Sequence, residues 1–286
     1  MLKDISIGQF FPGNSVIHKL DPRTKIILAT LFIVAVFSAN NPVAFATLVL
    51  VTILLVGISR ISLKVILKSI KPIVAILIFT AVINLFMTAG EGEPLVSWWI
   101  INIYTEGIVR AVLMVVRVVV LIVGTSILLT YTTSPISLTD GIEALLSPFK
   151  KIGLPVHTFA MMMSIALRFI PTLIEETEKI MNAQKSRGAD FTSGSLIQRA
   201  KALIPILIPL FVSSFKRAEE LATAMECRCY RGDNNRTKLV KLQYRGRDIL
   251  FILIFLLLAA AVITLIFFTE LLSSLGPVLA ILFYKV

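Results

Sequence analysis

Residues 249–269 read ILFILIFLLLAAAVITLIFFT and contain no charged residue. A helix needs about 20 mostly apolar residues to cross the hydrocarbon core of a bilayer. Inside the bilayer the backbone must satisfy its own hydrogen bonds, which an α-helix does. This stretch therefore predicts a membrane-spanning helix near the C-terminal end of the sequence.

Four further stretches meet the same requirement, at about residues 24–39, 42–58, 72–89 and 106–131. Asn40-Asn41-Pro42 predicts a tight turn between the first two. Asp21-Pro22 predicts a helix start, because Asp is a favoured N-cap and Pro suits the first helical position. We therefore predict an all-α, polytopic membrane protein with about five transmembrane helices.

The composition of the whole chain supports this fold class. Of its 286 residues, 57% are apolar and 16% are charged, against roughly 25% charged residues in a typical soluble domain. A soluble enzyme, a disordered tail and a disulfide scaffold are excluded. The net charge of +11 would suggest nucleic acid in a soluble protein, whereas in a membrane protein it indicates cytoplasmic loops beside anionic lipid. We expect membrane lipid, and no nucleic acid, as a partner.

The positive charges are unevenly distributed along the chain. Lys and Arg number four in residues 1–25, four in the loop after the second span, none in residues 90–105 and 17 in residues 132–248. Because cytoplasmic loops carry the excess of positive charge, we expect a multi-pass protein of the cell membrane with a cytoplasmic N-terminus and an external C-terminus. Residues 1–23 lack the apolar core of a cleavable signal peptide and predict a cytoplasmic lead-in.

Residues 132–248 are too charged to span a membrane cleanly and too apolar for an ordinary loop. Their pattern predicts three helices, at about residues 137–150, 155–187 and 196–228, separated by glycines. A sixth crossing within residues 155–175 or 203–215 stays open. The predicted organisation is an N-terminal membrane domain with four spans (1–131), a cytoplasmic helical region (132–248) and a C-terminal transmembrane helix (249–286).

The ends of the two longer cytoplasmic helices resemble each other. One reads Ala183-Gln184-Lys185-Ser186-Arg187-Gly188 and the other reads Ala224-Met225-Glu226-Cys227-Arg228-Cys229. Each places Ala one helical turn before an Arg with small neighbours, which leaves the guanidinium accessible to a carboxylate or carbonyl in a groove of another protein. Helix termination explains the same residues differently, because cations and Gly are favoured at helix C-termini. The local pattern leaves both interpretations open.

Several kinds of chemistry are missing from the chain. No Gly is followed by Lys, so the chain has no nucleotide-binding P-loop. The spans contain almost no acidic residue or histidine, which disfavours an ion-coupled transporter. The isolated His18 and His157 and the pair Cys227 and Cys229 do not have the spacing of a zinc site, so we expect no metal.

Two arginines lie seven residues apart on one face of the fourth predicted span, Arg110 and Arg117. Arg110 favours pairing with Glu106, four residues earlier, and an outward orientation. Arg117 lies deeper and needs a buried partner. Its role, in substrate binding, subunit contact or structure, stays open.

The sequence also resembles a known family. The matching motifs are GQFFPGNS at residues 8–15, HKLDPRTK at 18–25, LRFIP at 167–171 and AQKSRG at 183–188. In combination they resemble the transmembrane T component of energy-coupling factor (ECF) transporters, which belongs to the same broad family as the cobalt-transporter T subunit. The resemblance covers essentially the whole chain.

This resemblance implies a membrane domain with long cytoplasmic coupling helices that dock into two ABC-type ATPase subunits through X-Arg-X motifs. In this sequence the motifs map to Ser186-Arg187-Gly188 and Cys227-Arg228-Cys229, with Ala183 and Ala224 packing beside them. The second motif departs from the usual Ala-Arg-Gly in both flanks, but cysteine is small. A separate substrate-binding S component would carry a vitamin or metal ion. ATP and Mg would bind to the partner chains, so this chain would be non-catalytic and hold no cofactor.

Three other functions stay possible on the sequence alone. They are a self-sufficient ion-coupled secondary transporter or channel, a membrane-anchored adaptor, and a membrane-bound enzyme, which the lack of a convergent polar set disfavours. The sequence does not identify the transported substrate or tell whether an S component is dedicated or shared.

Overall fold

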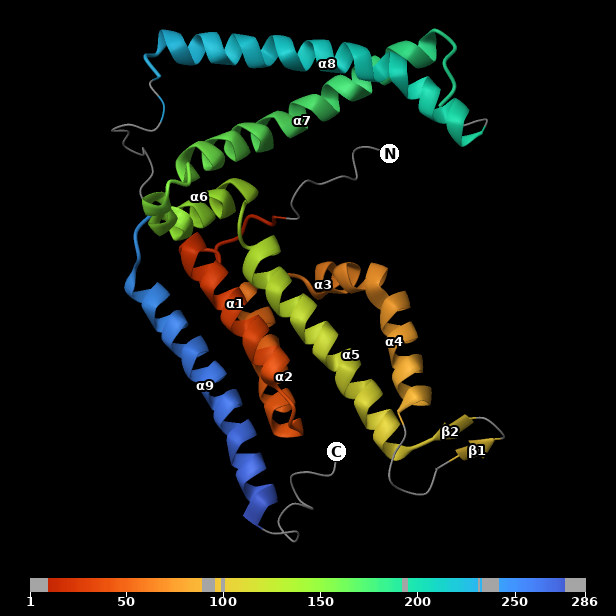
Figure 1. Cartoon of the computed structure of the whole chain (residues 1–286), viewed down its shortest axis with the longest axis vertical. Helices are drawn as coiled ribbons and strands as arrows, with labels where there is room; N and C mark the ends of the chain where they lie inside the picture. The colour runs from red at the N-terminus through yellow and green to blue at the C-terminus, as the bar shows by residue number, and fades with distance from the viewer. Residues whose placement is uncertain are drawn as a thin grey trace. The chain divides into compact units, whose positions relative to one another are not determined.

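The computed structural model describes residues 10–88, 96–98, 101–191, 195–230, 232 and 242–275. Contacts divide the chain into two compact units. The first unit, which we call the membrane unit, is built from the described residues within 10–141 and 242–275. The second, the long-helix unit, is built from the described residues within 142–232. Figure 1 shows that helices make up almost all of the described chain in both units, which confirms the predicted fold class.

The membrane unit is a helical bundle whose α5 contacts four other helices, α1, α2, α3 and α4, while α9 packs along α1 (Figure 1). A short antiparallel hairpin of two strands lies between α4 and α5. The elements are α1 (Pro22–Ser38), α2 (Pro42–Ser59), α3 (Leu63–Ile70), the 3-10 turn η2 (Lys71–Ile73), α4 (Val74–Met87), β1 (Val96–Trp98), β2 (Ile101–Ile103), α5 (Thr105–Thr125), the π-helical turn η3 (Ser126–Tyr131), α6 (Pro135–Leu146), whose last residues belong to the other unit, and α9 (Gly246–Leu275).

The long-helix unit contains a short 3-10 helix, η4 (Ser147–Ile152), followed by two long helices, α7 (Val156–Ser186) and α8 (Leu196–Cys227). The start of α7 is held by His157, whose Nδ1 lies 2.8 Å from Oε1 of Glu143 on α6. The bounds of α7 and α8 confirm the predicted helices at residues 155–187 and 196–228. The predicted helix at 137–150 is α6 and η4, with a change of helix type at Ser147.

Six helical segments are long and apolar enough to cross a membrane, which supports a multi-pass membrane protein. They are Pro42–Ser59, Leu63–Met87, Thr105–Tyr131, Val156–Ser186, Ile197–Cys227 and Gly246–Leu265. Four of them correspond to predicted spans. The predicted first span is α1, which has only 17 residues. The other two are α7 and α8, which include nearly all of residues 155–175 and 203–215, the two stretches in which a sixth crossing was left open.

The sequence did not reveal α3, because the charged stretch between the second and third predicted spans looked like a loop. Eight residues of that stretch are helical and are followed directly by η2 and α4. Figure 1 shows α3 turned across the direction of α4. The turn falls at Pro72, which lacks the amide hydrogen that a continuous helix would use.

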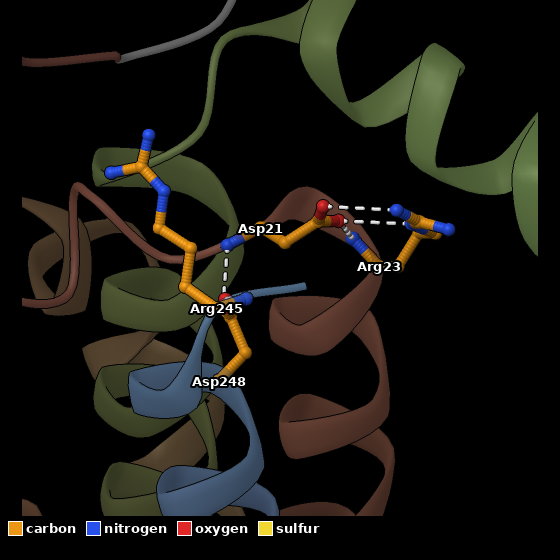
Figure 2. A network of polar contacts seen from close by, with 4 residues as sticks. All are labelled: Asp21, Arg23, Arg245 and Asp248. Carbon is orange, nitrogen blue, oxygen red and sulfur yellow. Dashed lines mark hydrogen bonds and ion pairs between the residues drawn. The ribbon is translucent and has the colours of Figure 1, made fainter. Parts of the chain in front are cut away.

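A buried aspartate connects the starts of α1 and α9, 227 residues apart in sequence (Figure 2). The backbone N–H of Asp21 donates to Oδ1 of Asp248 at 2.8 Å, and the N–H of Arg245 donates to Oδ2 at 2.8 Å. The carboxylate of Asp21 accepts bonds from the backbone N–H and the guanidinium of Arg23. The predicted N-cap at Asp21 is therefore confirmed, and it is part of a larger network.

Arg117 finds its buried partner at the end of α1. Its Nη2 donates to the carbonyl oxygen of Ala39 at 2.6 Å, and its guanidinium carbon lies 5.1 Å from the ring centroid of Phe45 on α2. Arg117 therefore stabilises the α1–α2 turn.

Among the described residues, no ion pair joins Glu106 to Arg110, so Arg110 lacks the partner expected for it.

A glycine lets α5 approach α1 in the centre of the bundle. A Cβ atom added at Gly124 would lie 2.2 Å from Cε1 of Phe32. The Phe32 ring is fully buried, in a core that also contains Leu28, Leu48 and Ile127. Because packed interiors relax only partly, the ring has no space into which it can move.

We expect the substitution Gly124→Ala to destabilise the protein by about 1–3 kcal/mol, the usual cost of overpacking a core. The thermal unfolding temperature of the purified chain in detergent measures this loss. Gly57→Ala in α2 is the matched control, because nothing lies within 4 Å of its added Cβ. Equal unfolding temperatures for the two variants would contradict the close approach of α5 to α1.

Candidate functional site

The two long helices have well-defined starts, which set where their opposite ends lie. α8 begins at a capping box, in which the Ser195 hydroxyl accepts from the N–H of Gln198 at 3.4 Å and the Gln198 side chain accepts from the N–H of Ser195 at 2.9 Å. α7 begins directly after Pro155, which has no N–H to leave unpaired. Each helix then continues for more than 30 residues.

The C-terminal end of α7 is closed by three backbone hydrogen bonds. The N–H groups of Arg187 and Ala189 donate to the carbonyl of Gln184, both at 3.0 Å, and that of Gly188 donates to Lys185 at 2.9 Å. Gly188 has a φ of +88°, the left-handed conformation that glycine adopts without steric cost. The backbone therefore turns sharply away just after Arg187.

The C-terminal end of α8 repeats this arrangement 41 residues later. Arg228 and Tyr230 donate to the carbonyl of Met225 at 3.1 and 3.0 Å, and Cys229 donates to Glu226 at 2.8 Å. Cys229 has a φ of +58°, so it takes the place of Gly188 despite its side chain. The two ends that looked alike in sequence therefore share one backbone geometry.

The arginines at both ends face outward. Arg187 and Arg228 are exposed, and so are the other predicted site residues, namely Ser186, Gly188, Cys227, Cys229, Ala183 and Ala224. Within the part of the chain that the structure describes, no hydrogen bond or ion pair occupies either guanidinium. Small neighbours and a turned backbone leave both charged groups free for a group on another molecule.

A shallow depression of about 480 Å³ runs along α8 up to this end. Its lining combines charged and small side chains, namely Lys216, Glu219, Glu220, Thr223, Ala224 and Cys227. Ala224 and Cys227 line it, so the depression reaches the residue directly before Arg228.

The two long helices are joined by an ion pair at matching positions. Nη2 of Arg217 on α8 lies 2.8 Å from Oε2 of Glu176 on α7. Arg187 follows Glu176 by 11 residues (187 − 176), and Arg228 follows Arg217 by the same 11 (228 − 217). At 1.5 Å per residue each helix end lies about 16 Å from the pair. Figure 1 shows α7 and α8 running in opposing directions, so their C-terminal ends point apart.

The structure therefore places the predicted site residues in two equivalent groups rather than in one constellation. Glu176 and Arg217 were not predicted as a pair, although the repeat of 41 residues between the two Ala-x-x-x-Arg ends also relates these two positions. A chemical centre is not apparent in the described residues, which contain no group of three metal-ligating side chains.

These features define a multi-pass helical membrane protein with two outward arginine ends, and comparison with known proteins gives its family. The profile of the CbiQ family, described as cobalt transport protein, matches residues 13–239. The energy-coupling factor transporter transmembrane protein EcfT of Clostridium kluyveri is 53% identical over 248 residues, covering 87% of this chain and 92% of that protein. The EcfT protein of Bacillus subtilis is 49% identical over 260 residues, covering 91% and 97%.

The chain belongs to the cobalt transport protein family, among the transmembrane components of energy-coupling factor transporters. This confirms the resemblance of the sequence motifs. The relatives named EcfT are transmembrane components of a transporter.

The left-handed conformation of Cys229 gives a test of the α8 end. Cys229→Gly should keep or strengthen the cap, because Gly adopts positive φ without steric cost. Cys229→Val should weaken it by about 1–2 kcal/mol, because a β-branched side chain disfavours positive φ more strongly than the Cys that it replaces. Cys227→Val is the control, since position 227 is still helical. Hydrogen exchange at the Tyr230 amide, which bonds to Met225, reports the difference. Equal protection in both valine variants would contradict the cap geometry.

Proposed function

We propose that the chain is the transmembrane scaffold of an ECF-type ABC importer. In this function it couples ATP hydrolysis in two partner ATPases to the movement of a separate S component, which takes up a vitamin or another micronutrient. The relatives named as EcfT support a component of such a transporter. The ATPases and the S component are proposed partners of this chain.

The observation that carries the proposal is the matched pair of exposed arginine ends. Arg187 and Arg228 leave their helices with the same backbone geometry, and both lie 11 residues beyond the Glu176–Arg217 pair. Two equivalent ends suit two similar binding partners, as a pair of ATPase subunits would be. A guanidinium fork binds a carboxylate or backbone carbonyls of such a partner through directed hydrogen bonds.

The same geometry suggests how force would pass through the chain. When the two ATPases close on ATP, they would displace the two arginine ends, and α7 and α8 would move as stiff rods joined near Glu176 and Arg217. ATP and Mg stay with the ATPases, and the residues of this chain perform no chemical step. Each end would need both its charge and its turned backbone to follow the ATPase that holds it.

An apolar face on α8 is a suitable surface for the S component. It consists of exposed side chains spaced three or four residues apart, and it carries no charge over about three turns of the helix. Its members are Ile204, Leu207, Ile208, Phe211, Val212 and Phe215. In this proposal the movement of α8 is transmitted to the S component through this face, because burying it stabilises the contact.

The proposed orientation places the N-terminus, α7 and α8 on the cytoplasmic side, where the ATPases and ATP are. The excess of Lys and Arg in residues 132–248 supports it. In domain terms, residues 1–131 and 249–286 would form the membrane part and residues 132–248 the coupling-helix region.

The double variant Arg187→Glu with Arg228→Glu should abolish co-purification of the ATPases, because each carboxylate would repel the acidic or carbonyl groups that bind an arginine. Each single variant should retain part of the binding through the unaltered end. Immunoblotting or mass spectrometry of the complex purified from detergent measures it. The matched control is Lys151→Glu with Lys201→Glu, two exposed cations away from the C-terminal ends of α7 and α8. Full ATPase recovery with the double arginine variant would contradict docking at these ends.

Two natural cysteines report on the same end of α8, since the chain contains only Cys227 and Cys229, both exposed. A membrane-impermeant maleimide should label them in inside-out vesicles and leave them unlabelled in right-side-out vesicles. In the assembled complex the ATPase should protect them. Labelling from the outer side would contradict the orientation, and undiminished labelling in the complex would contradict docking at Arg228.

A further inference from the structure

The helix α3 is held against the bundle by one of its faces. Ile66 is buried, and the hydroxyl of Ser69 shares a hydrogen bond with that of Tyr131, a buried residue at the end of η3. These contacts fix the rotation of α3 about its axis. The remaining surface of the helix is therefore presented to its surroundings in a defined way.

A second face of α3 is apolar and uncovered. Leu63 and Leu67, one turn apart, are 67% and 66% exposed. α3 follows α2 and leads into α4, both of which belong to segments able to cross a membrane. The turn at Pro72 sets α3 across α4 rather than in line with it (Figure 1). Exposed leucines at such a position suit the acyl chains at the membrane boundary.

A third face of α3 is cationic. Lys64 and Lys68 on α3 and Lys71, the first residue of η2, follow one another at intervals of four and three residues. They therefore form a stripe beside the leucines, and all are exposed. No acidic residue occurs between Arg60 and Lys71. Within the described part of the chain, no ion pair neutralises any of these four cations.

A cavity of about 270 Å³ opens at the start of α3. Arg60, which is exposed and has a φ of +56°, lines it together with Ser62, Ser15 and His18. Burial lowers the pKa of His18. Both of its ring nitrogens are hydrogen-bonded, Nδ1 with Ser15 Oγ at 2.6 Å and Nε2 with the carbonyl oxygen of Phe11 at 3.0 Å. The positive charge at the cavity is therefore that of Arg60.

We propose that α3 and the adjoining cavity bind anionic phospholipid. Arg60 and the three lysines bind the phosphates of the headgroups, and Leu63 and Leu67 lie among the acyl chains. A lipid surface fits the juxtaposition of a cationic stripe, an apolar stripe and a cavity with an unpaired arginine, because a soluble anion would not contact the leucines. This inference goes beyond the transport function and does not depend on ATPase docking.

The test uses the purified full chain in detergent with added phosphatidylglycerol or phosphatidylcholine, and native mass spectrometry counts the bound lipid. The wild type should prefer phosphatidylglycerol. Arg60→Asn with Lys64→Gln, Lys68→Gln and Lys71→Gln should lose that preference by about tenfold or more, since each basic side chain contributes to the attraction. Asn tolerates positive φ, so the turn at position 60 is retained.

Two controls separate charge from general damage. Lys64→Arg with Lys68→Arg and Lys71→Arg should keep the preference, and so should Lys151→Gln with Lys179→Gln and Lys201→Gln, which remove exposed charges elsewhere. An unchanged preference in the neutralised variant, or an equal loss in the Lys151 set, would overturn the proposal. Displacement of the lipid by millimolar glycerol phosphate would also overturn it, because the site would then be one for soluble anions.

Discussion

A residue in the left-handed conformation directly after an arginine ends each of the two long helices, and the candidate function depends on this constraint. At Gly188 and Cys229 the chain turns away, so that Arg187 and Arg228 cap the C-terminal ends of their helices and are exposed. If either helix continued, its arginine would lie on the side of a rod with neighbours on both flanks. The ion pair between Glu176 and Arg217 joins the two helices at positions that lie equally far, in sequence, from their arginine ends.

The helix boundaries could be predicted from the sequence because local signals determine them. Asp21-Pro22 marks the start of α1, and Gly188 closes α7, so the observed limits fall within one or two residues of the predicted ones at these ends. Long apolar runs likewise identified α2, α5 and α9 as membrane helices. The similarity of the two arginine ends was also visible, because it lies in short stretches of sequence.

Contacts between distant residues could not be predicted in the same way. Nothing local relates Asp21 to Asp248, and the approach of Gly124 to the ring of Phe32 depends on how two helices pack. The helix α3 was missed because its lysines suggest a solvated loop, whereas packing of Ile66 against the bundle stabilises it as a helix. The left-handed conformation of Cys229 also contradicts the usual preference of residues that carry a Cβ.

The central claim is that this chain transmits movement and supplies no driving force itself. Uptake into proteoliposomes tests it most directly, with the purified chain alone compared with the complex isolated through it, against a panel of labelled B vitamins, Co²⁺ and Ni²⁺. We predict ATP-dependent uptake of one of these compounds by the complex and none by the chain alone under any ion gradient. Uptake driven by an ion gradient in vesicles that contain only this chain would contradict the claim.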